Sequence, residues 1–244
     1  MNQSYNCKII DFGNYYKVIK YEKAINHNFP SVNSKVRKNT IPTKSNIKNR
    51  TRRVKNCERE IFIGLVNRNF SVKDLFVTLT YKEEKVTLER GSKDFENWIK
   101  RLREKYGDFK YIAIRSFQKR GTLHYHVLIS IPRLSIEELK NGGLKWEHGT
   151  AKAVEIYSLN VSYGKSKLMK YLVKNMEEFK ADERSFGKRL FIKSKNLEIP
   201  EVLKGNYEEI VSSINEKSPE LKLVEKSKFK TKYLGTMEVS IFKK

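Results

Sequence analysis

Two histidines stand two residues apart in a segment whose composition is typical of a β-strand. His124 and His126 are half of the four histidines in the 244-residue chain. Alternate residues of a strand share a face, so we expect these two side chains to project together while Leu123, Tyr125 and Val127 point into a core. Two neutral imidazoles side by side can hold a divalent metal ion. The alternative is a partly exposed strand that carries two incidental histidines.

A tyrosine and a lysine form a second pair of reactive side chains. Tyr171 and Lys174 lie one helical turn apart in a segment whose apolar residues recur at helical spacing from residue 168 to residue 176. We therefore expect them at neighbouring positions on one helix face. On spacing alone, the tyrosine can equally be a core aromatic with its hydroxyl at the edge, and the lysine a solvated charge.

The hydrophobic pattern predicts strands and helices in a mixed α+β order. Strands are predicted over residues 14–21, 74–81, 110–118, 123–131, 153–158 and 189–192, with a strand pair near 228–243. Helices are predicted over residues 52–69, 135–139, 166–176 and 201–215. A further helix should begin at Ser92 as its N-cap and stop at Gly107, with one apolar stripe made by Phe95, Trp98, Ile99, Leu102 and Tyr106.

A short link joins the second predicted strand to the strand that carries the histidines. Residues 119–122 are few enough for a β-hairpin. Ser116 and Gln118 lie on one face of the strand before this link, so pairing across the hairpin would bring one of them close to the histidines.

The composition points to a polyanionic partner. The formal net charge is +23, and a chain this basic most often meets nucleic acid. There is no apolar run long enough to span a bilayer and no secretory signal at the polar start of the chain, so we expect no membrane association. Cys7 and Cys57 make neither a zinc pattern nor a disulfide framework, and a cytoplasmic location is the default expectation.

The basic residues are concentrated near the N-terminus. The segment Ser34–Lys55 carries nine Lys or Arg residues and no acid. We interpret it as an arm that follows phosphates, against the alternative of a merely solvated linker. The predicted domains are a basic N-terminal extension over residues 1–55 and a domain over 56–244 whose core covers about 56–180. The side chains expected to contact DNA are Arg50, Arg52, Arg53, Lys119 and Arg120.

Three motifs in this order resemble those of the HUH endonucleases, specifically the rolling-circle replication initiators of plasmids and single-stranded DNA phages. Residues 76–80 (Phe-Val-Thr-Leu-Thr) look like the first motif of that family. Residues 121–126 (Gly-Thr-Leu-His-Tyr-His) look like its metal motif, and residues 171–174 (Tyr-Leu-Val-Lys) look like its nucleophile motif. The resemblance covers about residues 55–180, and three ordered motifs are far more specific than one.

This resemblance implies a fold, a cofactor and a reaction. Family members have a central antiparallel sheet with helices packed on it, a palm in which the His-x-His strand is central. The resemblance implies that His124 and His126 hold Mg²⁺ or Mn²⁺, which polarises the scissile phosphate of single-stranded or extruded origin DNA. Tyr171 would attack, leaving a 5′-phosphotyrosine link and a free 3′-OH that primes replication, and the strands can later be rejoined. Lys174 would hold the phosphate or the charge of the active site.

The chain departs from the family at the third metal ligand. Relatives usually place an acidic ligand eight residues before the first histidine, and Ser116 stands there. Gln118, on the same strand face and with a carbonyl oxygen, is our candidate for the third ligand. The alternatives are Glu83, Glu84 and His148.

A second departure concerns the number of tyrosines. Phage-type relatives often carry a second tyrosine four residues after the first, and Asn175 stands at that position. The chain therefore resembles an enzyme with a single catalytic tyrosine, and the sequence does not decide how a round of replication would end.

Other functions compete with this interpretation. A conjugative relaxase or a single-tyrosine transposase would use similar motifs, although relaxases commonly show a third histidine close to the pair. A non-catalytic nucleic-acid-binding module would use Tyr125, Phe117 and the basic arm for stacking and phosphate contact. The chain has no phosphate-binding loop of the NTPase type, so an initiator of this kind would need a host helicase as a partner. The oligomeric state is left open.

Overall fold

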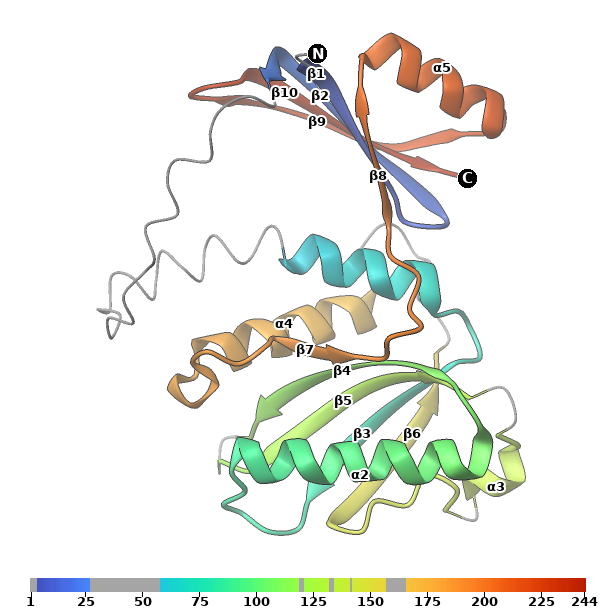
Figure 1. Ribbon diagram of the computed structural model, residues 1–244, viewed down its shortest axis with the longest axis vertical. Helices are drawn as coiled ribbons and strands as arrows, with labels where there is room; N and C mark the ends of the chain where they lie inside the picture. The colour runs from blue at the N-terminus through green and yellow to red at the C-terminus, as the bar shows by residue number, and fades with distance from the viewer. Residues whose placement is uncertain (1–3, 27–57, 119–120, 132–133, 141, 157–165) are drawn as a thin grey trace. The chain divides into compact units, whose positions relative to one another are not determined.

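The computed structural model describes residues 4–26, 58–118, 121–131, 134–140, 142–156 and 166–244. The chain divides into two compact units, one made of residues Met1–Asn46 and Ile199–Lys244 and the other of residues Ile47–Glu198. Each unit holds one five-stranded antiparallel sheet, which agrees with the predicted α+β class (Figure 1). The predicted boundary near residue 55, the basic arm over 34–55 and Cys57 lie outside the described residues.

The unit made of residues Ile47–Glu198, which we call the central unit, is built on a sheet with the strand order β6-β3-β5-β4-β7. Its strands are β3 (Leu75–Tyr81), β4 (Lys110–Phe117), β5 (Leu123–Ser130), β6 (Gly149–Glu155) and β7 (Phe191–Lys193). The strand with the two histidines, β5, is the middle strand and pairs with β3 on one side and β4 on the other. The position of the histidine pair in the centre of a sheet is therefore as expected.

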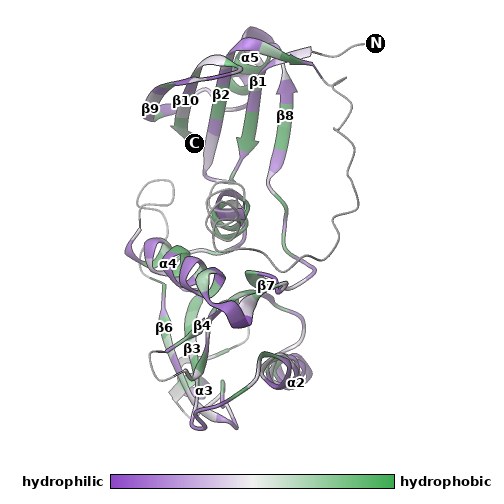
Figure 2. Ribbon diagram, turned by 90° about the vertical axis from the view of Figure 1, so that its left-hand side faces the viewer, coloured by the Kyte–Doolittle hydropathy of each residue, from purple (hydrophilic) through white to green (hydrophobic). Residues whose placement is uncertain are grey.

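One face of this sheet is covered by the long helix α2 (Leu88–Tyr106). The predicted stripe from Phe95 to Tyr106 is buried, and the ring of Phe95 stacks on that of Tyr125 with centroids 4.7 Å apart. Leu79, Val77 and the other inward residues of β3 are buried because strand residues alternate between the two faces. Figure 2 shows α2 as strongly hydrophilic on its outer side, as expected of a helix with one apolar stripe.

The N-terminus of α2 differs from the prediction. The N-cap is Thr87, whose hydroxyl accepts a hydrogen bond from the backbone N–H of Arg90 at 3.2 Å. Ser92 lies inside the helix, where its hydroxyl donates to the carbonyl of Leu88 at 2.8 Å. A serine can satisfy either role, and the earlier threonine starts the helix one turn sooner. Gly107 ends the helix as predicted, with a positive φ of 80°.

The opposite face of the sheet, which carries the histidines, is covered by two helices (Figure 1). Helix α4 (Lys167–Ala181) begins at its N-cap Ser166 and packs against β4. A helix over residues 58–69 packs beside β7, where Phe62 and Phe191 bring their ring centroids to 5.5 Å. The short helix α3 (Ile136–Lys140) and the 3-10 turn η1 (Glu183–Ser185) complete the unit.

The second unit joins the two ends of the chain. Its sheet has the order β8-β1-β2-β10-β9. The strands are β1 (Ser4–Asp11), β2 (Tyr15–Asn26), β8 (Glu201–Gly205), β9 (Lys222–Thr231) and β10 (Gly235–Lys243), and the helix is α5 (Tyr207–Lys217). A small core under α5 holds Cys7, Ile9, Tyr16, Val18 and Ile214.

Several element boundaries differ from the sequence prediction. Residues 201–205 form the edge strand β8, and α5 starts at Tyr207 because Asn206 caps it, so the predicted helix over 201–215 is wrong in its first turn. Strand β6 begins at Gly149, four residues before the predicted start at residue 153. None of the helices in the described part of the chain is long and apolar enough to cross a membrane.

Candidate active site

The sheet register places several polar side chains on the same face as the two histidines. His124 faces Thr80 on β3 and Ser116 on β4, and His126 faces Thr78 on β3. Directly opposed residues of antiparallel strands point to the same side, so this face is polar where β3, β4 and β5 meet. Leu123, Tyr125 and Val127 are fully buried on the α2 side, as the alternation predicts.

His126 lies at the centre of the contacts on this face. Its Nε2 atom is 3.0 Å from the hydroxyl of Ser116 and 3.4 Å from the hydroxyl of Tyr171. Burial of the ring, reinforced by the neighbouring His124, lowers the pKa of His126 from 6.5 to about 4, although the side chain of Asn175 opposes this shift. The imidazole is therefore neutral at pH 7 and keeps a lone pair for a metal ion or a proton.

His124 occupies the neighbouring position on the same strand face. Its Nδ1 atom is 3.4 Å from the hydroxyl of Thr80, and its ring centroid is 6.4 Å from that of His126. Both histidine side chains are almost completely buried. The strand geometry thus holds two imidazoles side by side in a site with little access to solvent.

Tyr171 reaches this site from α4, a helix far from β5 in the sequence. Its ring lies edge-on to the rings of His126 and Phe76, with centroid distances of 5.1 Å and 6.1 Å. The tyrosine is 45% exposed, so its hydroxyl lies between the histidines and solvent. The side-chain amide of Asn175 donates to the backbone carbonyl of Tyr171 at 2.8 Å, which ties the buried asparagine to the turn that carries the tyrosine.

Lys174 shares the exposed side of α4 with Tyr171. Its ammonium group is 3.7 Å from the carboxylate of Glu178 one turn further on, and its side chain is 73% exposed. The helix therefore places the lysine at a neighbouring position to the tyrosine, as its spacing predicts, but the contact it makes in this structure is with Glu178.

The candidates for a third ligand are in different surroundings. Ser116 is buried against His126, whereas Gln118 is exposed and its backbone closes the hairpin through Thr122. Glu83 pairs with Arg90 at 2.7 Å. His148 lies on the α2 side, 3.5 Å from Asp94. Glu84 is exposed in the loop after β3.

Two imidazoles on one face make a partial fit to a divalent metal ion. Neutral histidine nitrogens suit Mn²⁺ and related ions, whereas Mg²⁺ prefers oxygen ligands. Among the described residues, no group of three or more His, Cys, Asp or Glu side chains is arranged to hold a metal ion. Hydroxyl oxygens also contact the two imidazoles: those of Ser116 and Tyr171 contact His126, and that of Thr80 contacts His124.

None of the five side chains expected to contact DNA can be placed. Arg50, Arg52 and Arg53 lie outside the described residues, as do Lys119 and Arg120 in the hairpin link. Thr80, Asn175 and Lys152 also lie at the histidine face, where the register or the packing brings them, although the sequence alone predicts no catalytic or binding role for them. The strict alternation of Thr150, Lys152 and Val154 with two alanines is the pattern that indicates a half-exposed strand there.

Comparison with known families gives one match. Residues 74–177 match the model of a family described as replication-associated proteins of the ORF2 type, over less than half of the chain. The matched segment runs from the start of β3 to α4 and so includes both histidines and Tyr171. Neither the comparison with curated proteins nor the comparison with solved structures found a match. The segment that carries the histidines and Tyr171 is therefore similar to replication-associated proteins.

Proposed function

We propose that the protein is a rolling-circle replication initiator that nicks and rejoins DNA through a covalent tyrosine intermediate. Its substrate is single-stranded DNA, either free or extruded from a duplex origin. The observation that carries the proposal is the 3.4 Å contact between the hydroxyl of Tyr171 and Nε2 of His126, because it joins the nucleophile motif to the metal motif across 45 residues of sequence. The match of residues 74–177 to a replication-associated family supports the same activity.

In this reaction Tyr171 is the nucleophile. The phenol oxygen forms a bond to the scissile phosphorus while the bond from phosphorus to the 3′ oxygen breaks. The phenol proton leaves, and a proton goes to the departing 3′ oxygen to give a free 3′-OH. The partial exposure of Tyr171 allows a DNA strand to approach it from solvent, and its contacts with Phe76 and His126 hold the ring in one orientation. Rejoining is the reverse attack by a 3′-OH on the phosphotyrosine.

His124 and His126 would hold the divalent metal ion, Mg²⁺ or Mn²⁺. Such an ion would neutralise charge on the phosphate oxygens as the transition state forms. The depressed pKa of His126 keeps the imidazole unprotonated, which a ligand must be. The third metal ligand would come from Ser116 or Gln118, and substitution of each residue tests which of them contributes to metal binding. Lys174 would leave Glu178 for a phosphate oxygen when DNA binds.

A conjugative relaxase is a second candidate function, and it has less support. Relaxases bring a third histidine to the pair, and among the described histidines His148 is engaged with Asp94 on the other side of the sheet. With Tyr171 as the one tyrosine that the described residues bring to the site, an initiator of this kind would also need a second subunit or a water-activating carboxylate to end replication. A host helicase and a cytoplasmic location belong to this proposal.

The experiment is a covalent-trapping assay. The protein is incubated with labelled single-stranded oligonucleotides and Mn²⁺, and a DNA–protein adduct that survives SDS is expected. Tyr171→Phe should abolish the adduct, and His124→Ala should abolish it while DNA binding persists. An adduct that survives Tyr171→Phe would assign the nucleophile to another residue. No adduct with the wild-type protein across a pool of origin sequences would favour a non-catalytic DNA-binding module.

A further inference from the structure

The two described helices on the histidine face leave the side chains of its edge strand β6 exposed. Edge strand β6 pairs with β3 so that Thr150 faces Thr80, Lys152 faces Thr78 and Val154 faces Phe76. Because these partners in β3 also face β5, all three β6 side chains lie on the same side of the sheet as the histidines. All three are exposed, whereas α4 packs against β4 on the other flank of β5. We name the exposed side chains Thr150, Lys152 and Val154 the β6 ledge.

The single cation of the β6 ledge is not neutralised within the described part of the chain. Lys152 is exposed and forms no ion pair with any described carboxylate, unlike Lys174, which pairs with Glu178. Beside it, the apolar side chain of Val154 is 55% exposed. The ledge thus offers a cation, a hydroxyl and an apolar surface in a row along one strand.

The exposed side of α4 adds positive charge around the nucleophile. Lys167, Lys170 and Lys174 recur with Tyr171 at helical spacing, and all four are exposed. Tyr171 therefore lies among lysines on its own helix, and a further lysine stands on the sheet beyond the histidines. This charge is complementary to a strand of phosphates that passes over the site.

We propose that the β6 ledge binds the single-stranded DNA substrate beside the scissile phosphate, with Lys152 contacting a neighbouring backbone phosphate. The inference rests on the proposed function and specifies where the substrate strand runs. Lys152 stands two strands away from His126, a distance of roughly 10 Å between backbones, which a lysine side chain and one nucleotide together can bridge. Val154 would contact the face of a base, which is open only in a single strand, since stacking in a duplex hides it.

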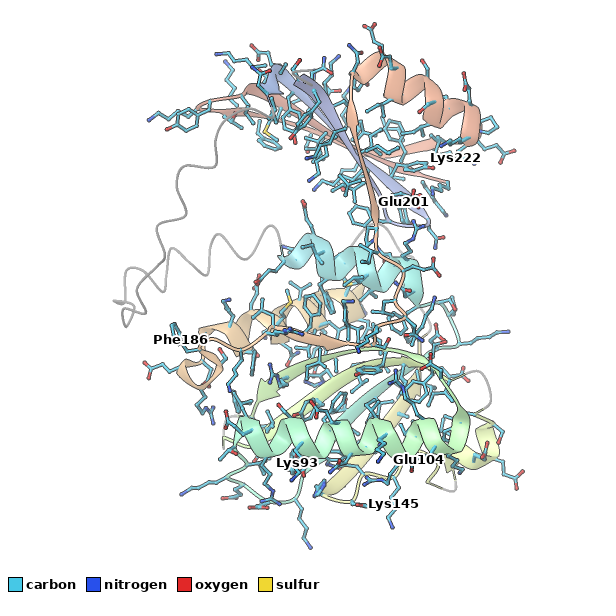
Figure 3. The ribbon with its side chains drawn as sticks, in the orientation of Figure 1. Lys93, Glu104, Lys145, Phe186, Glu201 and Lys222 are labelled. Carbon is cyan, nitrogen blue, oxygen red and sulfur yellow. The ribbon has the colours of Figure 1, made fainter. Side chains whose placement is uncertain are left out.

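The test measures DNA binding by a matched pair of variants. Lys152→Ala removes the cation of the ledge, and Lys93→Ala removes an equally exposed lysine from α2, on the other side of the sheet (Figure 3). Binding of a labelled single-stranded oligonucleotide of mixed sequence is followed by fluorescence anisotropy over a range of salt concentrations, in EDTA. Lys152→Ala should weaken binding by about 3- to 10-fold at low salt and reduce the slope of log affinity against log salt by about 0.7. Lys152→Arg should restore both values.

The outcomes separate this inference from the proposed function. If the wild-type protein forms the SDS-stable adduct but Lys152→Ala binds and reacts as Lys93→Ala does, the ledge is not the DNA path and the nicking activity stands. If no adduct forms yet Lys152→Ala alone lowers affinity and salt slope, the ledge binds DNA and the nicking proposal fails. Tighter binding of the same sequence as a duplex, with the same dependence on Lys152, would overturn the assignment to single strands.

Discussion

Nε2 of His126 is the atom on which the site converges. The hydroxyls of Ser116 and Tyr171 both approach it, at 3.0 Å and 3.4 Å. A neutral imidazole nitrogen takes part in one good hydrogen bond, as donor or acceptor according to the tautomer, so serine and tyrosine compete for it. Ser116 stands where an acidic residue would be a metal ligand in the resembled family. The serine therefore keeps the site polar without supplying the negative charge that binds a cation tightly.

Restoring an acid at this position should strengthen metal binding. In Ser116→Asp a carboxylate would face His124 across the β4–β5 ladder and contribute a charged oxygen ligand. We expect the affinity for Mn²⁺ to rise by about tenfold or more, equivalent to roughly 1.4 kcal/mol. Without metal, the buried carboxylate should cost about 1–3 kcal/mol of stability. Isothermal titration with Mn²⁺ and thermal unfolding in EDTA measure the two effects.

The matched control for this prediction is Ser116→Asn, which has the size of aspartate but no charge. Equal Mn²⁺ affinity in the two variants would show that the position does not point a ligand at the metal. In that case Gln118→Ala becomes the informative substitution, because Gln118, just after the end of β4, is the other candidate ligand.

Buried His126 should make the stability of the metal-free protein depend on pH. The folded-state pKa is about 4 and the unfolded value about 6.5, so between these values the unfolded chain binds a proton that the folded protein excludes. Stability is thus fully present above pH 6.5 and falls as the pH decreases toward 4. The loss from this residue should reach about 2 kcal/mol by pH 4.5, measured by urea unfolding in EDTA.

The variant His126→Gln isolates this contribution. It removes the titrating ring but keeps a polar side chain, so the difference between wild type and variant should shrink as the pH falls through this window. A wild-type stability that is flat from about pH 6.5 to about 4.5, or that changes in parallel with that of the variant, would mean that the imidazole is not held neutral by burial.

Among the elements, the edge strand β6 lies very close to the backbone of β3 at the first residue of β6, Gly149. A Cβ atom added to Gly149 would stand within 3 Å of the carbonyl oxygen of Thr80 and the amide nitrogen of Lys82. Both neighbours are backbone atoms, so the contact cannot be relieved by a change of rotamer. Glycine at this position is what lets β6 approach β3 and bring its exposed residues next to the histidine face.

Gly149→Ala should therefore destabilise the central unit. We expect a loss of about 1–3 kcal/mol in the free energy of unfolding, measured with urea, because the start of β6 must shift away from β3. The neighbouring Thr150→Ala is the control, since it removes an exposed side chain and should change stability by less than about 0.5 kcal/mol. Equal stabilities of the two variants would argue against the close approach of these strands.

Elements with a strong local pattern could be predicted from the sequence. The alternation in β3 and β5 and the stripe on α2 follow from burial on one face, which is visible in a short window. Strand β8 was not predictable in the same way, because four of its five residues are exposed and its composition suits a polar helix equally well. The predicted N-cap Ser92 lies five residues after the N-cap of the structure, Thr87, and both residue types suit a cap, so local composition does not locate the start of α2.

The sequence predicts the reactive residues of the site better than it predicts the elements that surround them. The motifs bring out His124, His126 and Tyr171, and the register explains why the histidines share a face. Which part of that face is exposed depends on which strand forms the edge of the sheet and on the side of β5 on which α4 packs. Both features depend on contacts between residues far apart in the sequence. The sequence around Lys152 therefore does not reveal that this residue lies beside the histidine face.

In the molecule as a whole, the two ends of the chain form one sheet. Strand β2 pairs with β10, and β1 pairs with β8, so that the central unit lies between the paired segments in the sequence. Pairing at this separation leaves no pattern in a sequence window, so the sequence alone predicts residues 199–244 only as a C-terminal part of the domain over 56–244. In the structure, β1 and β2 pair with each other, and their other neighbouring strands, β8 and β10, both come from the C-terminal segment.

Removal of residues 199–244 should therefore unfold β1 and β2 while leaving the central unit folded. A two-stranded hairpin is marginal in water, and the truncation takes away both flanking strands and α5. Hydrogen exchange followed by mass spectrometry should show peptides from residues 4–26 losing protection, and peptides from β3, β4 and β5 keeping it relative to the full-length protein. Because Tyr171 and both histidines belong to the central unit, adduct formation should persist. Loss of protection in β5 would instead mean that the C-terminal segment is needed to fold the site.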